Sequence, residues 1–118
     1  MSSASNPITV IIRSAPSADL EAAELALALG AFDIPVRVVF SDAGLFWLLK
    51  QEPRKPHGKA PLKVLSAFPM YGIDTLYYYA EDLARCGINE SQLPPQAKGL
   101  SRTELQEFMF SSSQCLTF

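Results

Sequence analysis

The sequence contains few of the side chains on which metal binding and nucleophilic catalysis depend. It has one histidine, His57, and two cysteines, Cys86 and Cys115, whose positions match no zinc-ligand spacing. His57 also lacks a serine, cysteine or carboxylate at a recognisable triad spacing. We therefore expect neither a metal site nor a catalytic histidine.

A long apolar segment, a strong net charge and a glycine-rich phosphate loop are also absent. No run approaches the roughly 20 apolar residues of a membrane span, and the opening MSSASNP is not typical of a secretion signal. These absences favour a cytoplasmic protein without membrane contact, in which both cysteines stay reduced. The formal net charge of -2 gives no general attraction to nucleic acid, and without the glycine motifs no nucleotide or other cofactor is expected.

The residues that are present are typical of one globular domain over residues 1–118, with 48% hydrophobic and 19% charged side chains. Two β-branched runs, Ile8–Ile12 and Val36–Phe40, predict strands that are buried on both faces. The apolar stripe over residues 18–29 predicts a helix between them that ends at Gly30. This strand–helix–strand unit implies that the two strands are parallel neighbours.

The rest of the chain continues this alternation. A capping box at Ser101 and Glu104 opens one of the later helices. The expected elements are a helix over 44–50, a loop over 51–61, a near-helical segment over 60–70, a strand over 74–79, a helix over 81–86, a weak strand near Ala97, a helix over 101–110 and a strand over 114–118. The order predicts an α/β fold, a three-layer sandwich with a mainly parallel, flavodoxin-like sheet of about five strands.

Ligands of such sheets lie beyond the carboxyl ends of the strands. The loop 14–17 precedes a helix N-terminus that could hold an anion, although it lacks the glycines of a phosphate cradle, and a plain capped turn is the alternative. Tyr79 lies where the third expected strand meets its helix. A phenol is a poor nucleophile at neutral pH, because its pKa is near ~10.

Five apolar residues in a row form the segment 45–49, which is more than one face of a surface helix buries in its own core. This surplus predicts a subunit interface anchored by Phe46 or Trp47, since aromatic side chains dominate interfaces. A helix wedged between the sheet and a loop is the alternative. The expected interface residues are Leu45, Phe46, Trp47, Leu48, Tyr78 and Tyr79.

The segment 54–59 concentrates three cations around the only histidine. Arg54, Lys55 and Lys59 could contact an RNA backbone and displace its counterions, or they could form a solvated loop.

Neither cysteine has the sequence context of a reactive thiol. Cys86 falls at the end of the expected helix 81–86, where the helix dipole disfavours a thiolate, so it is a poor candidate nucleophile. Cys115 falls in the last expected strand and is expected in the core.

The order of these motifs resembles the sulfur-relay family that includes the DsrE, DsrF and DsrH proteins and their TusD, TusC and TusB relatives. The resemblance covers nearly the whole chain and is strongest for the DsrF/TusC branch. It rests on the segments ITVIIRSAPS, VRVVFSDAGLFWLLK, MYGIDTLYYYAEDLARCGI and CLTF.

This resemblance implies a hexamer of three paralogues that pass persulfide sulfur between cysteines, toward the 2-thiouridine of a tRNA wobble position or in sulfur oxidation. The DsrE/TusD branch has its working cysteine just after the third strand, and that register falls on Tyr79 here. Cys86 is seven residues later and out of register. The resemblance therefore implies a non-catalytic subunit beside DsrE/TusD-like and DsrH/TusB-like partners, with a downstream acceptor protein and tRNA as further contacts.

Three other functions stay open from the sequence. One is a direct persulfide carrier that uses Cys86, and another is a flavodoxin-like binding module, which rests on the fold alone. The third is a binding protein that assembles with itself and needs no paralogues.

Overall fold

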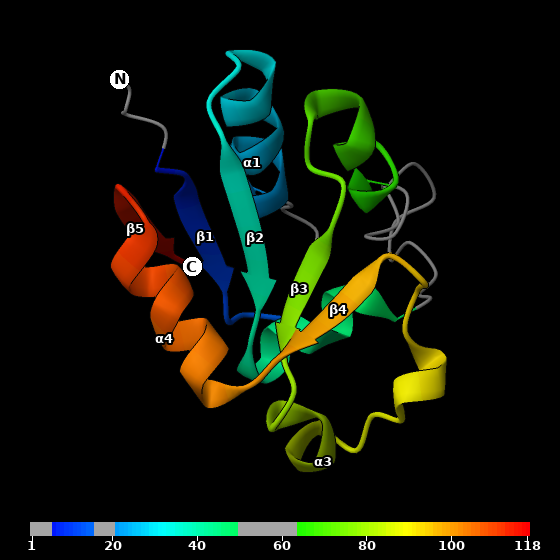
Figure 1. The fold of residues 1–118 in the computed structure, drawn as a ribbon. Coiled ribbons are helices and arrows are strands. Elements are labelled where there is room, and N and C mark those ends of the chain that lie inside the picture. The colour runs from blue at the N-terminus through cyan, green and yellow to red at the C-terminus, as the bar shows by residue number, and fades with distance from the viewer. Residues whose placement is uncertain (1–5, 16–20, 50–63) are drawn as a thin grey trace.

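A single five-stranded sheet organises the computed structural model, which describes residues 6–15, 21–49 and 64–118 (Figure 1). The strands are β1 Ile8–Ile12, β2 Val36–Phe40, β3 Leu76–Tyr79, β4 Ala97–Leu100 and β5 Gln114–Thr117. Every pair of neighbours is parallel, in the order β4-β3-β2-β1-β5. The α/β class and the parallel sheet of five strands expected from the sequence are confirmed.

Short helices connect these strands. They are α1 Glu21–Ala31, the 3-10 helix η1 Asp42–Leu48, the 3-10 helix η2 Phe68–Tyr71, α3 Asp82–Cys86, the 3-10 helix η3 Glu90–Gln92 and α4 Arg102–Ser111. None of the helices in the described ranges is long and apolar enough to cross a membrane.

The two faces of the sheet are covered unequally. On one face, alternate side chains such as Val10, Val38 and Leu76 pack with α1, η1 and η2 in a large buried cluster. On the other face, Ile11 and Val39 belong to a small cluster that α4, alone among the described helices, covers. The helices therefore form two layers around the sheet, as the three-layer prediction requires.

The strand order differs from the flavodoxin-like order that the sequence predicted. In that order β1 lies between β2 and β3, whereas here β1 lies between β2 and β5. The chain builds β1 to β4 in one direction and then returns to add β5 beside β1. Because crossovers between parallel strands are right-handed, a connection that runs back across the sheet passes over its opposite face. This explains why α4 lies on the face opposite to the other described helices.

The segment after β2 forms the 3-10 helix η1 and not the α-helix predicted for residues 44–50. A 3-10 helix has three residues per turn, so residues three apart lie on the same face. Gly44 and Trp47 form one buried face, and Leu45 and Leu48 form another. Only the third face, which carries Phe46, is turned partly outward.

Candidate functional site

The connections after β3 and β4 leave the sheet toward opposite faces, α3 on one side and α4 on the other (Figure 1). Ligands of open α/β sheets bind at the carboxyl edge where such connections diverge. The last residue of β3 is Tyr79, and it pairs in register with Leu100 at the end of β4. Tyr79 therefore ends β3 at the switch point of the sheet, the place where the connections after neighbouring strands diverge to opposite faces.

The Tyr79 hydroxyl is held in the protonated form. It donates a hydrogen bond to Oε2 of Glu81 at 2.5 Å. This bond is the main cause that raises the pKa of Tyr79 above its ordinary value, and the nearby carboxylates Glu81 and Asp82 raise it further. Arg102, at the start of α4, acts in the opposite direction. The phenol at the switch point is thus a hydrogen-bond donor and not a nucleophile.

A buried carboxylate holds the neighbouring part of this edge together. Asp82 is only 4% exposed. It accepts a hydrogen bond from the backbone N–H of Asp42 at 2.6 Å and another from Arg85 at 2.5 Å. Asp42 itself has a left-handed backbone, with φ 51, which an aspartate tolerates better than most residues. Asp82 therefore ties α3 to the start of η1.

Exposed arginines complete this charged cluster. Arg13, after β1, and Arg85 lie 3.7 Å and 3.6 Å from the carboxylate oxygens of Asp42. Both guanidinium groups are more than half exposed, so each pair stabilises the fold only slightly. This cluster was not among the sites predicted from the sequence. The signal was present, because Asp42 and Asp82 each follow a predicted strand within three residues.

Cys86 lies beside this cluster, at the end of α3, in an environment that favours the neutral thiol. Its Sγ donates to the backbone oxygen of Asp42 at 3.3 Å. Burial raises the pKa of the Cys86 thiol, the carboxylates of Asp82 and Asp42 raise it further, and Arg85 only partly opposes them. The arrangement agrees with the sequence argument that Cys86 is a poor nucleophile.

Four of the six side chains predicted for a subunit interface are buried within the subunit itself. Leu45, Trp47, Leu48 and Tyr78 lie inside the core of the subunit itself, at most 4% exposed. Trp47 also donates its indole N–H to the backbone oxygen of Ser14 at 2.9 Å. The 3-10 geometry turns the helix faces of Leu45, Trp47 and Leu48 inward, and Tyr78 points into the same buried cluster from β3. An interface at Phe46 and Tyr79 stays a prediction.

Other predicted sites fall at the surface or outside the described residues. The basic residues Arg54, Lys55 and Lys59, together with His57, lie in the segment 50–63, outside the described ranges. Cys115, expected in the core, is exposed, because β5 forms an edge of the sheet. Among the described residues, no three His, Cys, Asp or Glu side chains are grouped as metal ligands would be.

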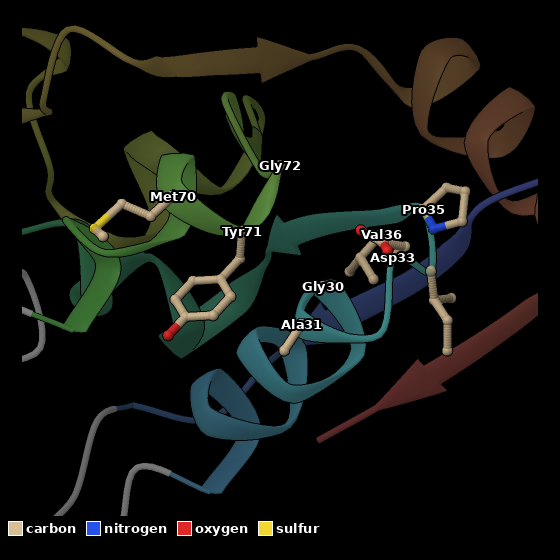
Figure 2. A pocket seen from close by; sticks show the side chains of 9 residues that line it. Gly30, Ala31, Asp33, Pro35, Val36, Met70, Tyr71 and Gly72 are labelled. Carbon is tan, nitrogen blue, oxygen red and sulfur yellow. The ribbon is translucent and has the colours of Figure 1, made fainter.

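A pocket of about 460 Å³ opens at the other end of the sheet, between the end of α1, the turn into β2 and the end of η2 (Figure 2). Gly30 permits the close approach, because a Cβ there would lie 2.6 Å from the backbone oxygen of Tyr71. Among the described residues that line it, Asp33 alone is charged at neutral pH. Tyr71 contributes the other titratable side chain of this lining, and no hydrogen bond joins it to Asp33 in the described structure, so we assign the pocket no chemistry.

Comparison with known proteins agrees with the family suggested by the sequence motifs. The chain is 38% identical over 105 residues to a protein TusC homolog of Pseudomonas aeruginosa, covering 88% of this chain and 87% of that protein. It is 30% identical over 115 residues to a protein TusC homolog of Vibrio parahaemolyticus, covering 94% and 98%.

The fold is similar to that of the ychN protein from E. coli, with a TM-score of 0.82 and 18% identity over 96% of this chain and 99% of that one. At this identity the likeness shows the fold alone. A model of the DsrE/DsrF-like family matches residues 7–118, nearly the full length of the described sheet and its helices. The chain therefore belongs to the DsrE/DsrF-like family.

Proposed function

We propose that this chain is a non-catalytic subunit of a heteromeric sulfur-transfer complex in the cytoplasm. Membership of the DsrE/DsrF-like family and the likeness to two TusC homologs support a role in sulfur relay. Its partners are DsrE/TusD-like and DsrH/TusB-like paralogues, in a hexamer. The complex passes persulfide sulfur toward an acceptor protein, and from there to the wobble 2-thiouridine of tRNA or into sulfur oxidation.

The observation that carries this proposal is the phenol of Tyr79 at the switch point. A sulfur carrier needs an accessible sulfur atom that ionises readily, because the thiolate is the attacking species. Tyr79 has no sulfur, and its hydroxyl is engaged with Glu81. The nearest thiol in the described structure, Cys86, is turned to the backbone of Asp42 and has a raised pKa. These features support a complex in which another subunit holds the sulfur.

Labelling with sulfur tests this proposal directly. The purified chain is incubated with a cysteine desulfurase and cysteine that carries labelled sulfur, and protein-bound label is measured before and after a thiol reductant. We expect no reducible label on the wild type or on Cys86→Ser. A family paralogue with a cysteine at the register of Tyr79, treated in parallel, serves as the positive control.

Reducible label that requires Cys86 would contradict the proposal and favour the rival function of a direct persulfide carrier. A purified protein with a flavin absorption spectrum would favour the flavodoxin-like binding module. Co-expression with the two paralogues and native mass spectrometry test the partners. A chain that never co-purifies with them, while they bind each other, would contradict the heteromeric assembly.

A further inference from the structure

Strand β5 is an open edge of the sheet. It pairs with β1 on one side and has no neighbour on the other within the described part of the chain (Figure 1). An edge strand presents a row of backbone N–H and C=O groups that can bind another strand.

The hydrogen bonds to β1 settle which groups face outward. The N–H of Phe118 donates to Ile11 at 2.9 Å, and its oxygen accepts from Arg13 at 2.8 Å. Because the direction of these groups alternates along a strand, Cys115 and Thr117 direct their N–H and C=O groups away from β1. Two residues of β5 thus offer two donors and two acceptors at the open edge.

The side chains along this edge do nothing to prevent pairing. Residues 111–118 contain no charged side chain and no proline. The opposite edge differs, because β4 carries Lys98 and follows Pro94 and Pro95, which are features that natural sheets use to block edge pairing. Of the two edges, only that of β5 lacks such protection.

Exposed apolar side chains lie next to the same edge. The Sγ of Cys115 lies 3.8 Å from the backbone oxygen of Met109, so the end of α4 borders β5. Met109 is 46% exposed and the adjacent Phe110 is 90% exposed. A partner strand on β5 would therefore be flanked by apolar surface on the α4 face.

We propose that β5 pairs antiparallel with β5 of a second copy of this chain, about a twofold axis at Leu116. In this register Cys115 of each copy lies opposite Thr117 of the other. Each of these two pairs exchanges two backbone hydrogen bonds, so the four outward N–H groups all meet outward C=O groups. Such an isologous contact needs no partner of different sequence, and the uncharged edge side chains impose no repulsion between copies. The two Leu116 side chains meet on the same face of the sheet as Val10, which pairs with Leu116.

This proposal does not depend on the role in sulfur relay, and the two can fail separately. It concerns how many copies of the chain associate, whereas the labelling experiment concerns which thiol carries sulfur.

The first test removes one outward donor. Thr117→Pro deletes an N–H that faces away from β1, and proline is tolerated at such a position of an edge strand. Thr117→Val, which keeps the N–H and the branched shape, is the matched control. By light scattering we expect twice the 12.9 kDa chain mass for the wild type and Thr117→Val, and the single mass for Thr117→Pro.

The second test does not require the proline variant to fold. In the proposed register the Cα atoms of Cys115 and of Thr117 in the second copy are about 5.5 Å apart, within the range of a disulfide. Two Cys115 residues are offset diagonally by about 7–8 Å, which is too far. We expect mild oxidation of Thr117→Cys to give a dimer in which Cys115 of one copy is linked to the introduced thiol of the other, identified by peptide mass spectrometry. The wild type should give no linked dimer.

Several results would overturn the proposal. A wild-type chain of single mass that gives no cross-link in Thr117→Cys would exclude the pairing. A dimer that is unchanged in Thr117→Pro would place the contact elsewhere, and a dimer linked through Cys115 of both copies would overturn the register. Loss of a paralogous partner in Thr117→Pro, with no self-association of the wild type, would identify a different strand as the occupant.

Discussion

At the scale of single residues, Gly44 lies where η1 passes against the end of β1. A Cβ at this position would lie 1.8 Å from the backbone oxygen of Ile12, which cannot move without disturbing the sheet. We expect Gly44→Ala to lower the free energy of unfolding by at least about 3 kcal/mol, the upper range for overpacking.

Gly87 provides the control for this prediction. It is the C-cap of α3, with φ 67, and a Cβ there would meet nothing within 4 Å. Gly87→Ala should therefore cost only the left-handed backbone strain, about 1 kcal/mol. Urea unfolding of the two variants measures the difference, and equal losses would show that steric contact at Gly44 is not the cause.

The raised pKa of Cys86 predicts how its reactivity depends on pH. Burial, followed by the carboxylates of Asp82 and Asp42, favours the neutral thiol, so less thiolate is present at a given pH than in a free cysteine. In the variant Cys115→Ser, the rate of alkylation by iodoacetamide should reach half its maximum at a higher pH than for a cysteine peptide. A midpoint at or below that of the peptide would show that the carboxylates do not act on the thiol.

At the scale of elements, the capping box of α4 is the clearest case in which local sequence determines structure. The N–H of Glu104 donates to Oγ of Ser101 at 3.2 Å, and the N–H of Ser101 donates to Oε1 of Glu104 at 2.9 Å. The bond from the backbone N–H of Ser101 to the carboxylate is the main cause that holds the pKa of Glu104 below its ordinary value of 4.5, and the Ser101 side chain lowers it further. The stabilisation is therefore present above pH 4.5 and is lost as the pH falls through the lower pKa of the folded state.

Two variants test this cap by urea unfolding. Ser101→Ala should cost about 1 kcal/mol at about pH 7, as is typical for the loss of an N-cap. Glu104→Gln should be less stable than the wild type at about pH 7, and the difference should shrink as the pH falls to about 3. A difference that is independent of pH would mean that the charge of Glu104 contributes nothing to the cap.

Other elements show where local sequence is insufficient. The β-branched runs of β1 and β2 gave the correct bounds, because burial on both faces leaves a continuous apolar pattern. The segment after β2 forms a 3-10 helix in place of the predicted helix with surplus apolar residues, and its close approach to Ile12 at Gly44 is a tertiary contact that no local pattern contains. The exposure of Cys115 likewise followed from the strand order and not from the strand itself.

The candidate site was predictable to a similar degree. The position of Tyr79 at the end of β3 followed from the strand pattern and the alternation of elements. Its hydrogen bond to Glu81 and the link between Asp42 and Asp82 depend on side-chain geometry that the spacing alone does not fix. The pocket beside Gly30 joins segments that are far apart in the sequence, and only the tertiary fold brings them together.

At the scale of the whole molecule, the unequal covering of the two faces predicts unequal local stability. In the described part of the chain, one face of the sheet packs against α1, η1 and η2, whereas the other is covered by α4 alone. Segments with few buried contacts open at a lower free energy than the core. We expect the amide hydrogens of α4 to exchange faster than those of β1 and β2.

Arg37, on β2, holds α4 to that thinly covered face. Its guanidinium lies 4.0 Å from the centre of the Phe108 ring and donates to the Phe108 backbone oxygen at 2.7 Å and to Ser111 at 2.9 Å. A lysine has a single ammonium group and cannot reproduce the planar set of N–H donors of the guanidinium group. Arg37→Lys should therefore accelerate exchange in α4 by about tenfold, the loss expected for one charged hydrogen bond. Exchange in β1 should change far less.

The exposed Lys98, on the same face of the sheet, supplies the control for this comparison. Lys98→Gln should leave exchange in α4 unchanged, because the effect of Arg37 comes from its bonds to the end of the helix and not from positive charge on that face. If Arg37→Lys accelerated α4 and β1 equally, α4 would open only with the whole sheet. The two faces would then form one cooperative unit in spite of their unequal covering.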